Sequence, residues 1–265
     1  MDRTFLDPET NTKGGDSRMK QSSRRVRWWG IVLIVLVLLA AVFLIYVSDY
    51  YRADGTAQQA MLSSETVSVT ETAYGWWFDG PAEDRALIFY PGAKVEETAY
   101  APLLHLLAEE GMDACLVKMP FHFAFFKPNA AGSVLENHDY SQWYIGGHSL
   151  GGVFASKYAA EHPETFAGVV LFASYPIQKL PDPMTELLLM GSEDQVINWD
   201  RLESGRQYAP SRYDEYTIEG GNHAQFGSYG PQNGDGTAVI PAEEQIQETV
   251  SFIITTLGAE KSIEK

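Results

Sequence analysis

The chain has 265 residues, of which 45% are hydrophobic and 20% charged, a composition that predicts one folded domain with or without appendages. Its formal net charge of −16 leaves no basic surface for a nucleic acid. The single cysteine, Cys115, excludes an intrachain disulfide framework and a cysteine-built zinc site, and the six histidines form no HExxH pair. We therefore expect neither a nucleic-acid partner nor a metal ion.

Residues 28–47 form a run of 20 residues with no charge and no proline. As a helix rising about 1.5 Å per residue, this run matches the thickness of a bilayer's hydrocarbon core. Trp28 and Trp29 at one end, with Tyr46, Tyr50 and Tyr51 at the other, are typical of interfacial aromatic belts. A buried core helix is the alternative, but the neighbouring basic tail favours a transmembrane anchor.

The charges on the two sides of this run differ in sign. Residues 1–27 carry seven basic and four acidic side chains and so account for +3, which leaves −19 for the rest of the chain. By the positive-inside rule, residues 1–27 are a cytoplasmic tail and the acidic remainder lies outside the cell. The apolar run is longer than the roughly 7–15 residues of a cleavable signal and has no good cleavage site, which favours a retained anchor. The lone thiol and the absence of glycosylation sequons are typical of a bacterial surface protein.

Residues 48–64 are polar and small and are predicted to be a linker, so the main domain is expected over residues 65–265. In this domain, apolar or alternating runs predict strands, and leucine, isoleucine and valine at helical spacing predict helices. The expected strands are 66–72, 86–90, 114–117, 143–145, 169–172, 187–190 and 213–218, and the expected helices are 103–107, 153–162 and 246–257. Buried strands alternating with helices predict an α/β fold, in which a mostly parallel sheet is covered by helices on both faces.

The heptapeptide at residues 146–152, Gly-Gly-His-Ser-Leu-Gly-Gly, contains G-x-S-x-G between a predicted strand and a predicted helix. This is the context of a nucleophile elbow, in which the serine occupies a strained turn and its flanking residues must be small. The following helix offers unpaired N–H groups to a developing negative charge. Ser149 is therefore the candidate nucleophile, and a glycine-rich tight turn without catalysis is the alternative.

A nucleophilic serine needs a base and an orienting carboxylate, which follow it in the chain order Ser, Asp or Glu, His. Asp194 follows the strand 187–190 and is the expected acid, with Glu193 as the alternative. His223 follows the strand 213–218 and is the expected base. The other histidines are less suitable, because they lie in predicted helices, inside the elbow or before the serine: His105, His162, His148, His122 and His138.

These motifs together resemble the α/β-hydrolase superfamily, and more narrowly the membrane-associated bacterial proteins of the α/β-hydrolase fold-5 family. The likeness runs from about residue 90 to about residue 252 and includes stretches at 89–95, 117–121, 146–152, 191–194 and 222–227. The resemblance implies the α/β-hydrolase fold, a hydrolase activity and a Ser149–Asp194–His223 triad. The HGGG type of oxyanion loop is absent, and Pro91-Gly92-Ala93 occupies its place. By position, the oxyanion donors are expected to be the backbone N–H groups of Leu150 and Ala93.

Three further segments carry weaker signals. The connection between the strands 169–172 and 187–190 contains three prolines and is too short for a helical cap, so we expect a minimal lid. The aromatic stretch 120–126 follows a strand and is expected either to line a substrate pocket or to belong to the core. Residues 233–236, Asn-Gly-Asp-Gly, lack the spacing of a calcium-binding loop and are expected to form a tight turn.

The sequence thus predicts a membrane-anchored, single-pass serine hydrolase that needs no cofactor. Its expected partners are a small-molecule acyl ester, whose carboxylester or thioester bond is cleaved through an acyl-enzyme, and the lipid bilayer around residues 28–47. An amidase or peptidase on the same fold remains an alternative. A non-catalytic surface binding module is a second alternative, against which the complete set of Ser149, Asp194 and His223 argues.

Overall fold

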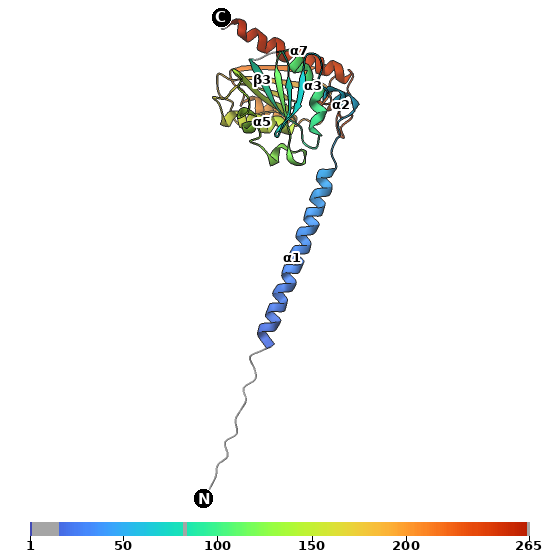
Figure 1. Cartoon of the computed structure of the whole chain (residues 1–265), viewed down its shortest axis with the longest axis vertical. Helices are drawn as coiled ribbons and strands as arrows, with labels where there is room; N and C mark the ends of the chain where they lie inside the picture. The colour runs from blue at the N-terminus through green and yellow to red at the C-terminus, as the bar shows by residue number, and fades with distance from the viewer. Residues whose placement is uncertain (2–15, 82–83, 264–265) are drawn as a thin grey trace. The chain divides into compact units, whose positions relative to one another are not determined.

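The computed structural model describes Met1, residues 16–81 and residues 84–263, which divide into two compact units, Met1–Ser48 and Asp49–Lys265. Helix α1 (Asp16–Ser48) forms the described part of the first unit. Its portion Trp28–Ser48 spans 21 residues with a mean hydropathy of 3.2, long and apolar enough to cross a membrane (Figure 1). The predicted apolar helix is present, whereas its place in a membrane stays a prediction. Most of the predicted tail lies outside the described residues.

The second unit is here called the catalytic unit because it contains the residues predicted to be catalytic. It is built on an eight-stranded sheet in the order β1-β2-β4-β3-β5-β6-β7-β8. β2 pairs antiparallel with β1 and β4, and every other pairing is parallel, as the α/β prediction requires. The strands are β1 Ser68–Glu71, β2 Gly75–Asp79, β3 Arg85–Tyr90, β4 Asp113–Val117, β5 Gln142–His148, β6 Phe166–Phe172, β7 Thr185–Gly191 and β8 Arg212–Ile218. The carboxyl ends of β3 to β8 therefore lie along one edge of the sheet, here called the carboxyl edge.

The helices cover both faces of this sheet. Every residue of β4 and β7 is buried, and so are nearly all of β3, β5 and β6, which requires cover on the two sides. α3 packs against α7 and β4, while α5 lies along β3, β5 and β6. The helices are α2 Gly55–Ala60, α3 Ala101–Glu109, α4 Ala131–Leu135, α5 Leu150–Glu161, α6 Trp199–Arg206 and α7 Ala242–Ile263, and the 3-10 turns are η1 Glu97–Tyr100, η2 Pro120–His122, η3 Ala124–Phe126 and η4 Ala224–Phe226.

The predicted strands and the three predicted helices are all present, with ends displaced by a few residues. The short elements β2, α2, α4 and α6 were not expected, because none carries a regular apolar repeat. Residues 173–184, between β6 and β7, contain no helix in the structure, which agrees with the expected minimal lid.

The segment expected to be a linker, residues 48–64, is folded over most of its length. Asp54 accepts hydrogen bonds from the N–H groups of Thr56 and Ala57 and so caps α2, and Ala57 is fully buried. Tyr51 forms a parallel bridge with Val95, next to the carboxyl end of β3. Residues 49–64 therefore belong to the catalytic unit, although their polar composition suggested a linker.

Candidate active site

Ser149 lies between β5 and α5, at the carboxyl edge of the sheet. Its φ of 52° and ψ of −123° fall outside the helical and extended regions, a conformation that costs on the order of 1–3 kcal/mol in a non-glycine residue. The Ser149 N–H donates to Phe172 O on β6 at 2.9 Å, and the Ser174 hydroxyl donates to Ser149 O at 2.7 Å. These two bonds hold the strained turn and leave the Ser149 side chain half-buried rather than enclosed.

The glycines around Ser149 are required because the end of β3 passes close to the turn. A Cβ atom on Gly147 would lie 2.4 Å from Tyr90 O, and a Cβ atom on Gly151 would lie 2.2 Å from the same oxygen. Both distances are far shorter than a carbon–oxygen contact allows. The G-x-S-x-G pattern thus has the steric reason that the sequence suggested.

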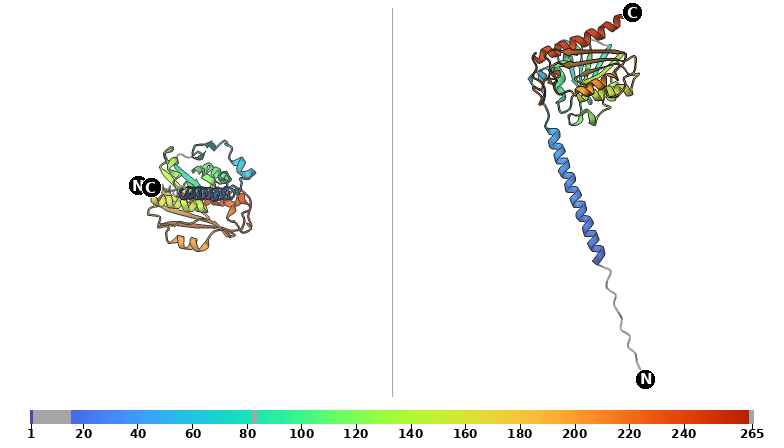
Figure 2. Two further views of the ribbon diagram at one scale, coloured as in Figure 1. Left: turned by 90° about the horizontal axis from the view of Figure 1, so that it is seen from below. Right: turned by 180° about the vertical axis from the view of Figure 1, so that it is seen from behind.

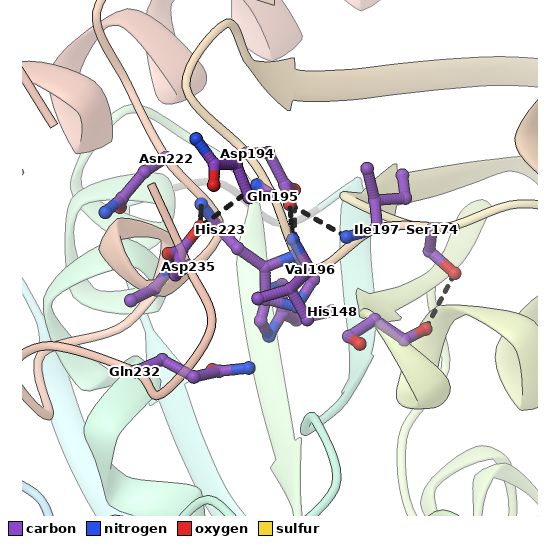
Figure 3. Close-up of polar contacts among 12 residues, drawn as sticks. His148, Ser174, Asp194, Gln195, Val196, Ile197, Asn222, His223, Gln232 and Asp235 are labelled. Carbon is purple, nitrogen blue, oxygen red and sulfur yellow. Dashed lines mark hydrogen bonds and ion pairs between the residues drawn. The ribbon is translucent and has the colours of Figure 1, made fainter. Parts of the chain in front are cut away.

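Asp194 and His223 form a buried pair at the same edge, after β7 and β8. Asp194 Oδ2 accepts from His223 Nδ1 at 2.8 Å, and the two side chains are 0% and 1% exposed. Asp194 Oδ1 accepts from the N–H groups of Val196 and Ile197, each at 2.8 Å (Figure 3). Three donors therefore fix the carboxylate. The bond from His223 Nδ1 to Asp194 selects the His223 tautomer that carries its proton on Nδ1, so that Nε2 can accept a proton.

Glu193, the alternative acid, does not contact His223. Glu193 is half-buried, and its carboxylate accepts from the Ser192 hydroxyl at 3.1 Å, while its backbone N–H donates to Gly221 O. Glu193 thus joins the loop after β7 to the loop after β8 through its backbone, and of the two candidate acids it is Asp194 that presents its carboxylate to the imidazole.

His148, the residue before Ser149, is completely buried between His223 and Tyr100. Its ring centroid is 4.4 Å from that of His223, and its Nδ1 lies 2.8 Å from the Tyr100 hydroxyl. Because that hydroxyl accepts from the Gly92 N–H at 3.1 Å, its own proton is available to His148 Nδ1. Burial, with a smaller contribution from His223, holds the pKa of His148 well below its ordinary value. A neutral His148 can therefore lie beside His223 without repelling a positive charge on it.

The same tyrosine connects this cluster to the predicted oxyanion loop. Tyr100 holds the N–H of Gly92, and the next peptide carries the N–H of Ala93. Among the described residues, the N–H groups of Ala93 and Leu150 donate to no acceptor, although Ala93 itself is half-buried. Both donors that position predicted are thus available to a ligand near the carboxyl edge.

Asp235 is a site residue that the sequence analysis missed. Its Oδ2 accepts from the Ala224 N–H at 2.8 Å, and its Oδ1 lies 3.3 Å from the Gln195 N–H and 3.4 Å from the His223 N–H. Gln195 follows Asp194 directly in the loop after β7, here called the acid loop, and His223 and Ala224 lie in the loop after β8, here called the base loop. The Asp235 carboxylate therefore joins the acid loop to the base loop. A turn at 233–236 was expected, but no local pattern reveals which distant N–H groups its aspartate meets.

The contact between Ser149 and His223 and the position of the main cavity complete the description of the site. In the described parts of the chain, Ser149 Oγ and His223 Nε2 form no hydrogen bond, a contact that often tightens only when substrate binds. A cavity of about 720 Å³ lies behind the base loop, lined by residues that include Asn222, Gln225 and Asp235 but none of Ser149, Asp194 and His223. The cavity therefore does not identify the acyl pocket.

The strand order, the antiparallel β2 and the sharp turn after β5 define the α/β-hydrolase fold. In agreement, the sequence matches the model of the alpha/beta hydrolase family over residues 86–247. The chain belongs to this family, and its fold and family support a hydrolase. No curated protein sequence matches the chain significantly.

Solved structures share the fold at low sequence identity. An alpha/beta hydrolase enzyme from the metagenome of Mar Chica lagoon sediments, MGS-MChE2, has a TM-score of 0.56 at 12% identity and covers 73% of this chain and 99% of its own. Est1E from Butyrivibrio proteoclasticus has a TM-score of 0.51 at 14% identity, with coverages of 73% and 100%. A bacterial membrane phospholipase A has a TM-score of 0.52 at 12% identity, with coverages of 89% and 99%. At these identities the likeness establishes the fold alone.

Proposed function

We propose that this protein is a membrane-anchored serine hydrolase that cleaves a carboxylester or thioester through an acyl-enzyme. The observation that carries the proposal is the buried hydrogen bond between Asp194 and His223, on the same sheet edge as the strained turn of Ser149. A carboxylate, an imidazole of fixed tautomer and a serine at a sharp turn are the parts that nucleophilic acyl transfer needs.

In the proposed reaction, Ser149 Oγ attacks the acyl carbon while His223 Nε2 takes the hydroxyl proton. The imidazolium then returns this proton to the departing alcohol or thiol as the acyl-enzyme forms. Water attacks the acyl-enzyme in the second half, with His223 again as base, and the acid and free serine are released. Asp194 remains ionised throughout and stabilises the positive imidazole through Nδ1.

The N–H groups of Leu150 and Ala93 are the proposed donors to the tetrahedral oxyanion. Removing one such donor from a well-studied hydrolase lowers kcat by about 10²–10³-fold. Both donors here are backbone groups, fixed by α5 and by the bond from Gly92 to Tyr100, so they need no reorganisation when the charge forms. No step of this scheme calls for a cofactor.

We further propose that α1 anchors the enzyme as a single-pass protein, with residues 1–27 in the cytoplasm and the catalytic unit outside. The support is the 21-residue apolar stretch and the basic residues before it. A protease added to intact cells should then remove the catalytic unit and leave a tail-bearing fragment. Protection of that unit until the cells are lysed would overturn the proposed orientation.

The activity is tested by labelling the full chain with a fluorophosphonate, which reacts with an activated serine. The wild type should be labelled and Ser149→Ala should not, with loss of ester turnover on the order of 10⁶-fold in kcat. Ser192→Ala, a change of another hydroxyl beside the acid loop, should keep full labelling. An unlabelled wild type that folds normally would favour a binding module over an enzyme.

A further inference from the structure

The segment between β4 and α4 contains a cluster of aromatic residues bounded by two lysines. Residues 118–127, here called the aromatic loop, read Lys-Met-Pro-Phe-His-Phe-Ala-Phe-Phe-Lys. No acidic residue occurs between positions 114 and 135, in a chain whose net charge is −16. The loop is therefore a local basic and apolar region on an otherwise acidic unit.

Much of this aromatic surface faces solvent. Phe121, Phe125 and Phe126 are 46%, 63% and 43% exposed, and their rings contact one another edge to face at centroid distances of 5.3 and 5.4 Å. Elsewhere in the described part of the catalytic unit, the exposed large hydrophobic residues are far apart in the sequence: Leu62, Ile177, Trp199 and Val239. A contiguous cluster of this kind marks an interaction surface, whereas scattered single residues do not.

The loop is held in this conformation by buried groups. Phe121 and His122 have φ values of 57° and 59°, which strain residues other than glycine. Glu97, a buried carboxylate, accepts from the Met119 N–H at 3.1 Å and from His122 Nδ1 at 3.0 Å. The His122 carbonyl accepts from the Lys94 N–H at 2.9 Å. These hydrogen bonds hold the strained backbone of Phe121 and His122 in place. The exposed rings therefore belong to a fixed loop conformation.

Chain connectivity indicates what this surface meets. The ring of Tyr50 packs 4.0 Å from that of His122, and Tyr50 is only two residues beyond Ser48, where α1 ends. Since a residue extends at most about 3.6 Å, the aromatic loop remains within a short reach of the end of the apolar helix. Aromatic side chains enter the headgroup region of a bilayer, and lysines are attracted to anionic headgroups.

We propose that the aromatic loop docks on the surface of a bilayer that contains anionic lipid. The three exposed phenylalanines enter the boundary between headgroups and acyl chains, and Lys118 and Lys127 meet the headgroup charges. This inference rests on the membrane anchor of the proposed function. Because the loop follows β4, docking brings the carboxyl edge that bears Ser149 next to the lipid, from which an acyl ester can reach the site.

The test measures the depth of the loop in the full chain, reconstituted in nanodiscs that hold one copy each. A Phe125→Cys variant is labelled with a fluorophore and exposed to spin-labelled lipid. The native Cys115 does not compete, because it is fully buried and burial raises the pKa of its thiol. Ser251→Cys, an exposed position on α7, is the matched control, since α7 and the segment with η2, η3 and α4 lie at opposite ends of the catalytic unit (Figures 1 and 2).

Spin-labelled lipid should lower the fluorescence at position 125 about twofold or more and leave position 251 unchanged. Quenching should be stronger in phosphatidylcholine mixed with phosphatidylglycerol than in phosphatidylcholine alone, and Lys127→Gln should reduce that difference. A label at Phe126→Cys provides a second measurement if the first variant folds poorly.

Three results would overturn the proposal. In the first, aqueous iodide quenches the label at position 125 as strongly as the label at position 251, which means that the loop does not dock. In the second, the label at position 125 is protected only in nanodiscs that hold two copies, which means that a second chain covers the loop. Failure of the wild type to float with vesicles would remove the anchor and the docking together. Ser149→Ala should be quenched as the wild type is, so a failure of the proposed catalysis is distinguishable from a failure of docking.

Discussion

The two halves of the candidate site are held in place by different forces. Asp194 and Asp235 fix the acid–base half by accepting hydrogen bonds from N–H groups of both loops. The nucleophile half is fixed by backbone packing, with Ser149 strained and two glycines pressed against the end of β3. The comparison teaches that the acid–base half should be sensitive to a change of charge, whereas the nucleophile half should be sensitive to a single added methyl group.

Within this comparison, the largest expected effect concerns the acid. Asp194→Asn keeps the shape of the side chain but removes the charge that selects the His223 tautomer, so kcat should fall by roughly 10⁴-fold with little change in KM. Steady-state kinetics on a nitrophenyl ester measure this loss. The control Glu193→Gln should retain near-normal activity. A crippled Glu193→Gln beside an active Asp194→Asn would show that the acid is wrongly assigned.

The nucleophile half is tested by a methyl group. In Gly151→Ala the new carbon would press against Tyr90 O at 2.2 Å, so the turn must shift. We expect a loss of stability of about 1–3 kcal/mol and a fall in kcat on the order of 10²-fold as the serine moves. Thermal unfolding and kinetics measure the two effects. Gly132→Ala in α4 is the control, because its Cβ would meet only the Tyr158 hydroxyl at 3.5 Å; equal damage in both variants would refute the steric explanation.

Asp235 should give a smaller, graded loss in the acid–base half. Asp235→Asn replaces one acceptor oxygen by an amide NH₂ group. This NH₂ group cannot accept a hydrogen bond, so at least one of the N–H groups that now donate to the carboxylate loses its acceptor. We expect kcat to fall about 10–100-fold at nearly constant KM, as the loops loosen. The low-field proton resonance of His223 Nδ1–H should also shift or broaden. Asp214→Asn, an exposed change on β8, should alter neither quantity, and an unshifted resonance in Asp235→Asn would argue against a positioning role.

The smallest expected effect concerns a buried carboxylate that lacks such donors. Glu186 on β7 is 1% exposed, and burial, reinforced by Glu215, raises its pKa from 4.5 to about 8. The folded state therefore keeps a proton that the unfolded state loses above pH 4.5. Stability should fall as the pH rises from about 4.5 to 8 and then change no further through this group.

Glu186→Gln should remove this part of the pH dependence. We expect its melting temperature to exceed that of the wild type by several degrees at pH 8 and to match it near pH 4. The exposed change Glu164→Gln is the control and should leave the profile unaltered. Parallel profiles for the wild type and Glu186→Gln would show that Glu186 is not protonated in the folded protein. Asp194 is also a buried carboxylate, but unlike Glu186 it accepts three hydrogen bonds.

The sequence predicts most of this architecture because its strands are apolar and its motifs are local. Ser149 is predicted from the glycines around it, and Asp194 and His223 are predicted from their chain order after the serine. The bond from the Ala224 N–H to Asp235 and the bond from the Gly92 N–H to the Tyr100 hydroxyl join residues 11 and 8 positions apart, across turns whose course only the fold determines. β2 escaped prediction because its Gly-Trp-Trp-Phe-Asp sequence shows no strict alternation of apolar and polar residues.

The folded segment after α1 determines where the chain can be cut. The Tyr51 hydroxyl accepts from the Asn233 N–H at 2.9 Å, and Tyr51 N–H donates to Lys94 O at 2.8 Å. A shortened protein that begins at residue 65, the boundary suggested by composition, would lose ties to the turn of Asp235 and to the loop of Ala93. One that begins at Asp49 keeps both. A soluble form suited to crystallisation and inhibitor screening should therefore start at Asp49.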